Sequence, residues 1–434
     1  MAPDTSTSQA GAAKKTAPTG AARLISEVPL HEAASTATGV GELDRVLGGG
    51  IVAGAVVLLA GEPGVGKSTL LLDVAARWAT GNRKTLYICA EESAAQVRLR
   101  ATRVGALTDG LYLAAETDLG AVLAQIEEVN PELLVLDSVQ AVSVSGTDGV
   151  AGGVAQVREV TNALVRVAKQ RRLPVLLVGH VTKDGTVAGP RLLEHLVDVV
   201  LAFEGDRHSG LRLVRATKNR FGPADEVGCF EMTENGISEV QDPSHLFASS
   251  RLEPVPGTAL TVTLEGLRPL LGEVQALVAP TQAPAPRRVA HGLDAGRLSV
   301  ILAVLERKAN VRLHNQEVYT STVGGARLVD PAVDLALALA IASAAAEHAY
   351  HRPLIALGEI GLSGEVRRVA GLERRLAEAA RLGFELALVP PGFAGTVKGL
   401  RAIEVPHVAA AVEALELRPG KHRDNDRHLA VAEA

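Results

Sequence analysis

The segment Gly61-Glu62-Pro63-Gly64-Val65-Gly66-Lys67-Ser68 matches the phosphate-binding pattern G-x-x-x-x-G-K-[ST]. It follows the apolar run Val56–Ala60 and opens a helical pattern, which is the context that this chemistry requires. The glycines let backbone N–H groups wrap phosphates, and the helix N-terminus adds a partial positive charge. We expect Lys67 to reach the β- and γ-phosphates of a nucleotide and Ser68 to ligate Mg²⁺, with Thr69 beside it. The alternative is a glycine-rich turn that matches the pattern by chance.

Two acidic positions fit the same chemistry. The apolar run Leu133–Asp137 ends in an acid, which suits a Walker B aspartate that holds the metal through water. Glu91 follows the predicted strand Thr85–Ala90 and is our candidate for orienting or deprotonating the attacking water. Its neighbour Glu92 is the rival candidate. The alternative for both glutamates is a pair of solvated carboxylates in a loop.

A histidine is expected at the same edge of the sheet. His180 ends the predicted strand Pro174–Gly179, and strand ends on this edge face the ligand crevice of an α/β sheet. It could sense the γ-phosphate and move the loop Val181–Pro190 that follows. A capping or packing histidine is the alternative.

Composition limits the classes of function. The chain has 434 residues, of which 47% are hydrophobic and 21% charged, and its formal net charge is -5. This excludes a uniformly basic DNA-coating protein, so any nucleic-acid surface must be local. Cys89 and Cys229 lie far apart in apolar runs, as is typical of buried thiols in a reducing cytosol. A zinc site would need close-spaced ligand pairs, which the sequence lacks.

The ends of the chain have the composition of tails. Residues 1–35 are expected to form a disordered N-terminal tail without the apolar core of an export signal, and residues 418–434 a charged C-terminal tail. The longest apolar stretch, Leu335–Ala346, is too short to cross a bilayer. We therefore expect a cytoplasmic protein that does not bind membranes.

Residues 36–245 alternate apolar runs with amphipathic stretches, which favours an α/β fold with a mainly parallel sheet. The predicted strands are Ala55–Ala60, Thr85–Ala90, Leu133–Asp137, Pro174–Gly179 and Val199–Phe203. The predicted helices are Lys67–Ala79, Leu119–Val129 and Val154–Gln170. Arg212–Arg220 and Cys229–Val240 are expected to be antiparallel, with a hairpin turn at Asn235-Gly236.

A second α/β domain is predicted over residues 258–417, after a proline-containing linker at 246–257. Its expected elements are a strand pair in Leu260–Val278, a loop at Pro280–Pro286, the helix Arg297–Lys308, the helix Pro331–Ala345, a strand at Leu354–Ile360 and the helix Leu372–Leu382. Asp330 is expected to cap the helix that begins at Pro331, with proline at the first helical position.

Four motifs together resemble a known family. They are Thr38-Gly39-Val40-Gly41-Glu42-Leu43-Asp44-Arg45-Val46-Leu47-Gly48-Gly49-Gly50, the phosphate-binding loop, Ala90-Glu91-Glu92-Ser93 and Lys218-Asn219-Arg220-Phe221-Gly222. The set resembles the bacterial DNA-repair proteins of the RadA (Sms) family, and the K-N-R-F-G pentapeptide is far more specific than the loop alone. The resemblance extends over residues 36–417, where the second domain is similar to the peptidase domain of Lon.

The resemblance implies a RecA-like P-loop NTPase core joined to a Lon peptidase-like domain of ribosomal S5-like fold. It implies ATP as the nucleotide, hexameric rings, and binding to single-stranded and branched DNA. It also implies a role in homologous recombination alongside RecA, in which the family extends D-loops and drives branch migration.

The resemblance further implies roles for basic residues. Lys218 and Arg220 would point at the nucleotide of a neighbouring subunit, where a cation stabilises charge on the transferring phosphoryl group. The alternative is a basic β-hairpin edge in water. Lys183 and Arg191, after His180, could contact DNA phosphates in the ring channel, or could lie in an ordinary exposed loop.

One feature departs from the family. Its members usually begin with a zinc finger of two C-x-x-C pairs, but no cysteine precedes Cys89 in this chain. Zinc is therefore not expected here, and functions that depend on the finger are in doubt.

The second domain lacks the residues of a Lon peptidase. Ala332 stands at the position of the serine nucleophile and Glu373 at that of the lysine, and neither side chain can perform Ser–Lys covalent chemistry. We expect this domain to build the ring and to offer a DNA surface. Its three arginine pairs, which could meet phosphates or be plain solvated surface, are Arg287-Arg288, Arg367-Arg368 and Arg374-Arg375.

Two further functions remain open at this stage. A regulatory RecA-like ATPase that acts on protein partners would share the phosphate-binding loop and would leave ATP turnover insensitive to DNA. An ATP-dependent peptidase is disfavoured by Ala332 and Glu373.

Overall fold

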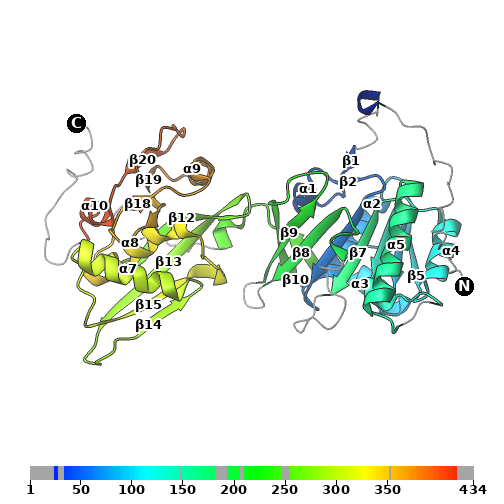
Figure 1. The fold of residues 1–434 in the computed structure, drawn as a ribbon, viewed down its shortest axis with the longest axis horizontal. Helices are drawn as coiled ribbons and strands as arrows, with labels where there is room; N and C mark the ends of the chain where they lie inside the picture. Colours follow the sequence, from blue (N-terminus) through cyan, green and yellow to red (C-terminus); the bar gives the residue numbers. More distant parts are fainter. Residues whose placement is uncertain are drawn as a thin grey trace, which may run out of the picture.

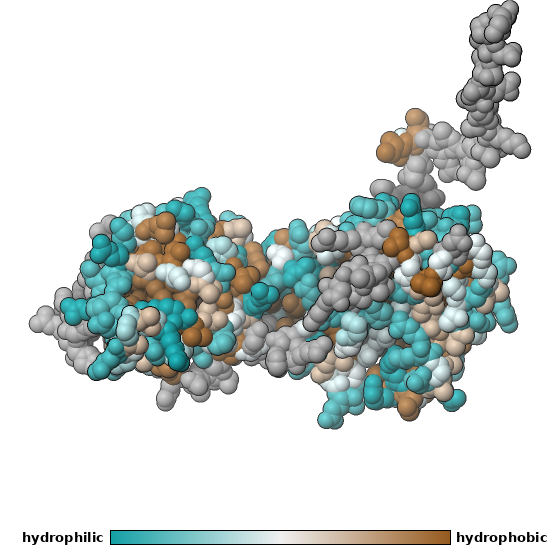
Figure 2. Space-filling model, turned by 60° about the horizontal axis from the view of Figure 1, so that its bottom comes forward, coloured by the Kyte–Doolittle hydropathy of each residue, from teal (hydrophilic) through white to brown (hydrophobic). Residues whose placement is uncertain are grey.

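The computed structural model describes residues 24–27, 34–146, 149–180, 193–205, 210–246, 255–350 and 353–417. These form two lobes, the N-terminal lobe (residues 34–246) and the C-terminal lobe (residues 255–417). Figure 1 shows the two lobes side by side along the longest axis of the molecule. Figure 2 shows them as two largely hydrophilic masses joined by a narrower middle.

The N-terminal lobe is built on a nine-stranded sheet of order β11-β10-β9-β8-β3-β7-β6-β4-β5. From β8 to β5 all neighbours are parallel, whereas β9, β10 and β11 form an antiparallel extension. The strands are β3 (Val56–Gly61), β4 (Thr85–Cys89), β5 (Leu111–Ala115), β6 (Leu133–Asp137), β7 (Val175–His180), β8 (Val199–Gly205), β9 (Leu211–Asn219), β10 (Val227–Thr233) and β11 (Gly236–Glu239). The central strands are buried on both faces, which explains their continuous apolar runs.

Helices cover both faces of this sheet and bury two separate apolar clusters. One cluster contains side chains of α1 (Gly41–Leu47), α2 (Lys67–Ala79) and α3 (Ala94–Arg103). The other contains side chains of α4 (Leu119–Val129) and α5 (Val154–Arg171). The short elements are η1 (Ile25–Glu27), β1 (Ser35–Thr36), β2 (Ile51–Val52), η3 (Val139–Ala141) and η4 (Pro243–Leu246).

The C-terminal lobe contains a seven-stranded sheet of order β14-β15-β13-β12-β16-β19-β20 and a separate pair, β17 and β18. The strands are β12 (Thr258–Glu265), β13 (Arg268–Pro280), β14 (Arg288–His291), β15 (Gln316–Thr322), β16 (Ile355–Ala356), β17 (Glu359–Ile360), β18 (Val366–Arg367), β19 (Leu386–Val389) and β20 (Arg401–Glu404). The helices are α7 (Ala295–Lys308), α8 (Asp334–Ala346), α9 (Leu372–Arg381) and α10 (Val408–Ala414), with short turns η5 (Val323–Gly325) and η6 (Pro331–Val333). None of the helices described in either lobe is long and apolar enough to cross a bilayer.

The structure confirms the predicted α/β fold class and most of the predicted elements. Helices α2 and α4 have the predicted bounds, and a tight turn joins β10 to β11 at the predicted hairpin, with Gly236 at φ 127°. The predicted strand Leu354–Ile360 is wrong as a single element. It forms β16 and β17, which belong to different sheets, because Gly358 turns the chain where an added Cβ would lie 2.3 Å from Val366 Cγ1.

The two lobes share a small apolar cluster. Leu211, Cys229 and Val240 of the N-terminal lobe pack with Leu270 of β13. Burial raises the pKa of the Cys229 thiol to about 11, so this side chain is uncharged at neutral pH. The thiol therefore acts as an apolar group in the contact between the lobes.

Candidate nucleotide-binding site

The phosphate-binding loop joins β3 to α2. Gly64 and Gly66 have φ values of 78° and 112°, which only glycine adopts readily, and an added Cβ on Gly64 would meet open space. Gly66 is the N-cap of α2 and has no side chain to satisfy the first backbone N–H groups of that helix. Those groups are available to an anion at this position.

Lys67 lies folded over the loop. Its Nζ donates to the carbonyl oxygens of Gly61 at 2.9 Å and Glu62 at 2.8 Å. Burial lowers the pKa of Lys67, while the nearby Asp137 and Glu91 carboxylates oppose that shift. The ammonium group therefore has only backbone partners here, and these can be exchanged for phosphate oxygens.

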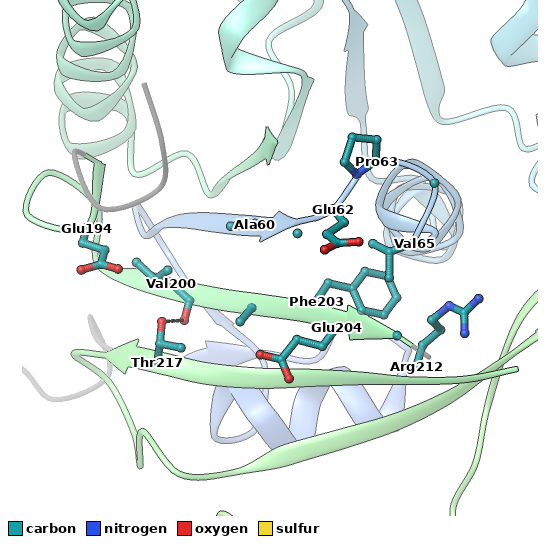
Figure 3. A pocket seen from close by; sticks show the side chains of 14 residues that line it. Ala60, Glu62, Pro63, Val65, Glu194, Val200, Phe203, Glu204, Arg212 and Thr217 are labelled. Atoms are coloured by element: carbon teal, nitrogen blue, oxygen red, sulfur yellow. Dashed lines mark hydrogen bonds between the residues drawn. The ribbon is translucent and has the colours of Figure 1, made fainter. Parts of the chain in front are cut away.

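A cavity of about 470 Å³ opens between the loop and the strands β8 and β9. Figure 3 shows Glu62, Pro63 and Val65 on one side of it, with side chains of β8 and β9 on the other. Phe203 contributes an apolar wall, while Glu204 and Arg212 contribute charges. The space beside the loop thus has the mixed apolar and polar lining that a small-molecule site requires.

Asp137 ends β6 at the same edge of the sheet and is almost completely buried. The hydroxyl of Tyr87, which is fully buried in β4, donates to Asp137 Oδ2 at 2.6 Å. Burial and the Asp137 charge raise the pKa of Tyr87, so the phenol keeps its proton. Sequence reasoning missed Tyr87, because a tyrosine inside an apolar strand gives no signal of a polar partner.

Glu91 is brought together with two other side chains. Ser138 Oγ donates to Glu91 Oε1, and His180 Nε2 lies 3.1 Å from the same oxygen. Neither ring nitrogen of His180 has a partner with good hydrogen-bond geometry among the described residues. Glu91 remains 44% exposed, so it can still reach a molecule on the loop. The structure thus joins the predicted candidates Glu91 and His180 in one cluster.

Glu92 has a different environment. Both of its carboxylate oxygens accept hydrogen bonds from Arg100 of α3. This pairing holds the side chain against the first helix after the loop. Of the two predicted rivals, Glu91 is the one that shares the cluster with His180.

Lys218 and Arg220 lie at the opposite edge of the sheet. Asn219 is in register with Val199, which is in register with Val57 near the start of β3. The loop starts at the other end of this strand, at Gly61, which is ~17 Å away at 3.3 Å per residue. The two cations therefore do not reach the phosphate-binding loop of their own chain.

Both cations have partners within the chain. Lys218 Nζ donates to the carbonyl oxygens of Glu194 and of Val197, the latter at 2.8 Å, and burial followed by the Arg220 charge lowers its pKa. Arg220 Nη1 lies 3.3 Å from Asp198 Oδ1. Asp198 keeps two other partners, since Lys169 Nζ is 2.6 Å from Oδ2 and the Val56 N–H donates to it at 3.0 Å. Arg220 can leave this carboxylate without isolating a buried charge.

The position corresponding to a peptidase site in the C-terminal lobe is closed. Ala332 is fully buried, and Asp330 accepts from its backbone N–H at 2.9 Å as the N-cap of η6, which leads into α8. The same carboxylate pairs with Arg375 at 2.6 Å, and Arg375 also donates to Val262 O at 2.7 Å. Glu373 is exposed in the first turn of α9.

The arginine pairs have partners inside the chain in most cases. For Arg375 the predicted contact with DNA phosphates is wrong, because its side chain is only 2% exposed and serves the buried ion pair with Asp330. Arg288, Arg368 and Arg374 donate to backbone carbonyls, and Arg367 pairs with Glu365. Lys183 and Arg191 lie outside the described residues.

Comparisons with known proteins agree with this architecture. Residues 27–186 match the family model described as AAA domain, and residues 325–392 match that of subunit ChlI of Mg-chelatase. The DNA repair protein RadA of Mycolicibacterium smegmatis is 55% identical over 410 residues, which are 93% of this chain and 88% of that protein. The DNA repair protein RadA of Bacillus subtilis is 45% identical over 396 residues, or 91% of this chain and 86% of that protein.

The chain belongs to the RadA family. The predicted resemblance is therefore confirmed, and so is the predicted RecA-like core. The chain is an ATP hydrolase of the P-loop type that uses a nucleotide and Mg²⁺. Among solved structures, a single ATPase domain aligns with 48% of this chain and 93% of its own length, with a TM-score of 0.43 and 13% identity.

Proposed function

We propose that this chain is an ATP-driven DNA motor in homologous recombination and repair. It binds single-stranded and branched DNA in the cytoplasm and drives branch migration or D-loop extension alongside RecA, as a ring of six copies. The observation that carries this proposal is the convergence of Lys67, Asp137 and Glu91 at one edge of the sheet in a chain whose relatives are named DNA repair proteins.

The loop from Gly61 to Ser68, with Thr69, binds the phosphates of ATP. Lys67 exchanges the carbonyls of Gly61 and Glu62 for phosphate oxygens, and the free N–H groups of the α2 N-terminus add hydrogen bonds. Ser68 and Asp137 would hold Mg²⁺, which supplies positive charge against the phosphates when bound. The hydrogen bond from Tyr87 fixes one oxygen of Asp137 and leaves the other for this role.

Glu91 orients and deprotonates the attacking water. Ser138 and His180 hold its carboxylate in place just after the end of β4. His180 precedes directly the segment that contains Lys183 and Arg191, so a displacement of that segment on DNA phosphates reaches the base through one residue. This connection couples DNA binding to hydrolysis.

Arg220 acts on the nucleotide of the neighbouring subunit. Its distance from its own phosphate-binding loop and the additional partners of Asp198 both support action in trans. The guanidinium would leave Asp198 for a phosphate oxygen across the subunit boundary, with Lys218 ordering the adjacent backbone. Hydrolysis therefore depends on ring assembly.

The C-terminal lobe has no peptidase function in this proposal. A buried alanine at position 332 and an exposed glutamate at position 373 provide no nucleophile and no activating base. The lobe builds the ring and offers surface arginines to DNA. A casein-cleavage assay tests the peptidase alternative directly, since measurable proteolysis would contradict this assignment.

The deciding experiment is the rate of ATP hydrolysis with and without single-stranded DNA at low and moderate salt. We expect stimulation that weakens as salt rises, because phosphate contacts release counterions. Basal hydrolysis that DNA leaves unchanged at both salt concentrations would reject the DNA motor in favour of a regulatory ATPase that acts on protein partners.

A further inference from the structure

The turn between β12 and β13 contacts the N-terminal lobe beside the K-N-R-F-G motif. The two-residue turn consists of Gly266 and Leu267, and the Leu267 N–H donates to Asp225 O at 2.7 Å. Gly266 has φ 61°, and an added Cβ would lie 2.0 Å from the same carbonyl oxygen. In Figure 1 this hairpin lies between the two lobes. Its tip is therefore in close contact with residues 220–226, the loop that joins β9 to β10.

This loop, which begins at Arg220, is held on its other side by the turn after α1. The Asn219 side chain accepts from the Phe221 N–H at 2.9 Å and donates to Leu47 O at 3.4 Å. Gly222 packs against Gly48, where an added Cβ would lie 3.5 Å from Gly48 Cα. The loop is thus enclosed between the N-terminal lobe and the hairpin tip.

Two ion pairs anchor the hairpin. Arg215 of β9 and Glu265 of β12 lie 2.7 Å apart and are each 25% exposed. Arg268 pairs with Glu42 of α1 in a contact that is almost completely buried, and Glu42 Oε2 also accepts from the Cys229 N–H at 2.9 Å.

Arg268 has further partners in the N-terminal lobe. Its guanidinium donates to the carbonyl oxygens of Val227 at 3.3 Å, Val240 at 3.2 Å and Gln241 at 2.9 Å. A buried charge with this many hydrogen bonds specifies one geometry, because any shift of the hairpin breaks several bonds at once. The middle of the molecule is narrow in Figure 2, so these contacts form much of the connection between the lobes.

We infer that the hairpin tip is a positioning element for Arg220. By fixing residues 220–226 from the outer side, it sets the direction in which the guanidinium points toward the neighbouring subunit. Arg268 and Glu265 are then positioning residues for ATP hydrolysis in the ring, although neither touches the nucleotide. This inference rests on the proposed function, in which Arg220 acts in trans, and it gives the C-terminal lobe a role in hydrolysis.

Arg268→Met in the full chain is the first test. We expect its ring to bind ATP with an unchanged KM and to turn it over roughly ten- to a hundredfold more slowly, the loss expected for a displacement of about 1 Å. The matched control is Arg381→Met, which removes an exposed ion pair between the lobes, that with Asp242 at 3.0 Å. The control should hydrolyse ATP at the wild-type rate.

A structural defect is separated from positioning by combining the change with Arg220→Ala. If the hairpin acts through Arg220, the double variant is no slower than Arg220→Ala alone, because coupled effects are not additive. Glu265→Gln keeps the shape of its side chain and should slow turnover by about two- to fivefold, again only while Arg220 is present. This milder variant gives the reading if Arg268→Met fails to fold.

Additive losses in the double variants, or wild-type turnover in both Arg268→Met and Glu265→Gln, would overturn the inference. A wild-type chain that does not hydrolyse ATP would instead reject the proposed function, so the two failures are distinct. An Arg220→Ala ring with normal turnover would also overturn the inference, because no trans-acting cation would remain to be positioned.

Discussion

The two lobes each place a turn before a buried helix, and the charges around the two turns are treated in opposite ways. At the turn before α2, Lys67 has only backbone carbonyls as partners and Glu91 is substantially exposed. At the turn before α8, Asp330 is neutralised by Arg375, and the neighbouring Asp334 by Arg297. The first turn is ready for a ligand, while the second has already paired its own charges.

This difference shows what turns a helix N-terminus into a site. Both turns present backbone N–H groups, but the one before α8 uses the Asp330 side chain to satisfy the Ala332 N–H. The glycine at the start of α2 has no side chain to do the same. An anion is therefore needed at the first position and excluded at the second.

The largest effect is expected at the open site. Lys67→Ala should weaken ATP binding by roughly a hundredfold or more, because the charge-assisted bonds to the phosphates are lost. Titration with a fluorescent ATP analogue measures this, with the exposed Lys84→Ala as the control. Retained tight binding would contradict the assignment of the loop.

Glu91→Gln should leave ATP binding intact and reduce hydrolysis by roughly 10²- to 10⁴-fold, because the amide cannot accept a proton from water. Steady-state turnover at saturating ATP is the measurement. Glu92→Gln is the matched control, since Glu92 is paired with Arg100. If the control loses hydrolysis and Glu91→Gln does not, the role belongs to Glu92.

Arg375→Met tests the closed site. It leaves Asp330 without its charged partner, so the C-terminal lobe should lose about 3–5 kcal/mol of unfolding free energy. Denaturant unfolding followed by a probe in that lobe measures the loss, and the exposed Arg401→Met serves as the control. Unchanged stability would mean that the ion pair does not hold this lobe together.

The smallest effect is expected for Tyr87→Phe, which removes one hydrogen bond to Asp137 and no buried volume. The Mg²⁺ concentration for half-maximal hydrolysis should rise roughly tenfold, while the rate at saturating Mg²⁺ changes little. Tyr112→Phe, at an exposed tyrosine of β5, should change neither quantity. A normal Mg²⁺ dependence of Tyr87→Phe would show that Asp137 needs no positioning.

Local patterns predicted the elements that carry the phosphate-binding loop because its residues are consecutive in the chain. Strand, glycines and helix act there as one segment, so β3 and α2 could be read directly. The same reasoning failed at Leu354–Ile360, where an unbroken apolar pattern covers two strands of different sheets. It missed α3 because that helix is polar overall, with only Val97 and Ala101 buried.

The amino-acid sequence by itself determined the family, the fold class and the loop that binds phosphate, since these depend on residues close together along the chain. Only the tertiary structure decided that Tyr87 donates to Asp137, that Glu91 meets His180 and Ser138, and that Arg375 is buried. Each of these contacts joins segments far apart in sequence. Their partners are selected by sheet register and by the need to pair buried charge, neither of which a local pattern records.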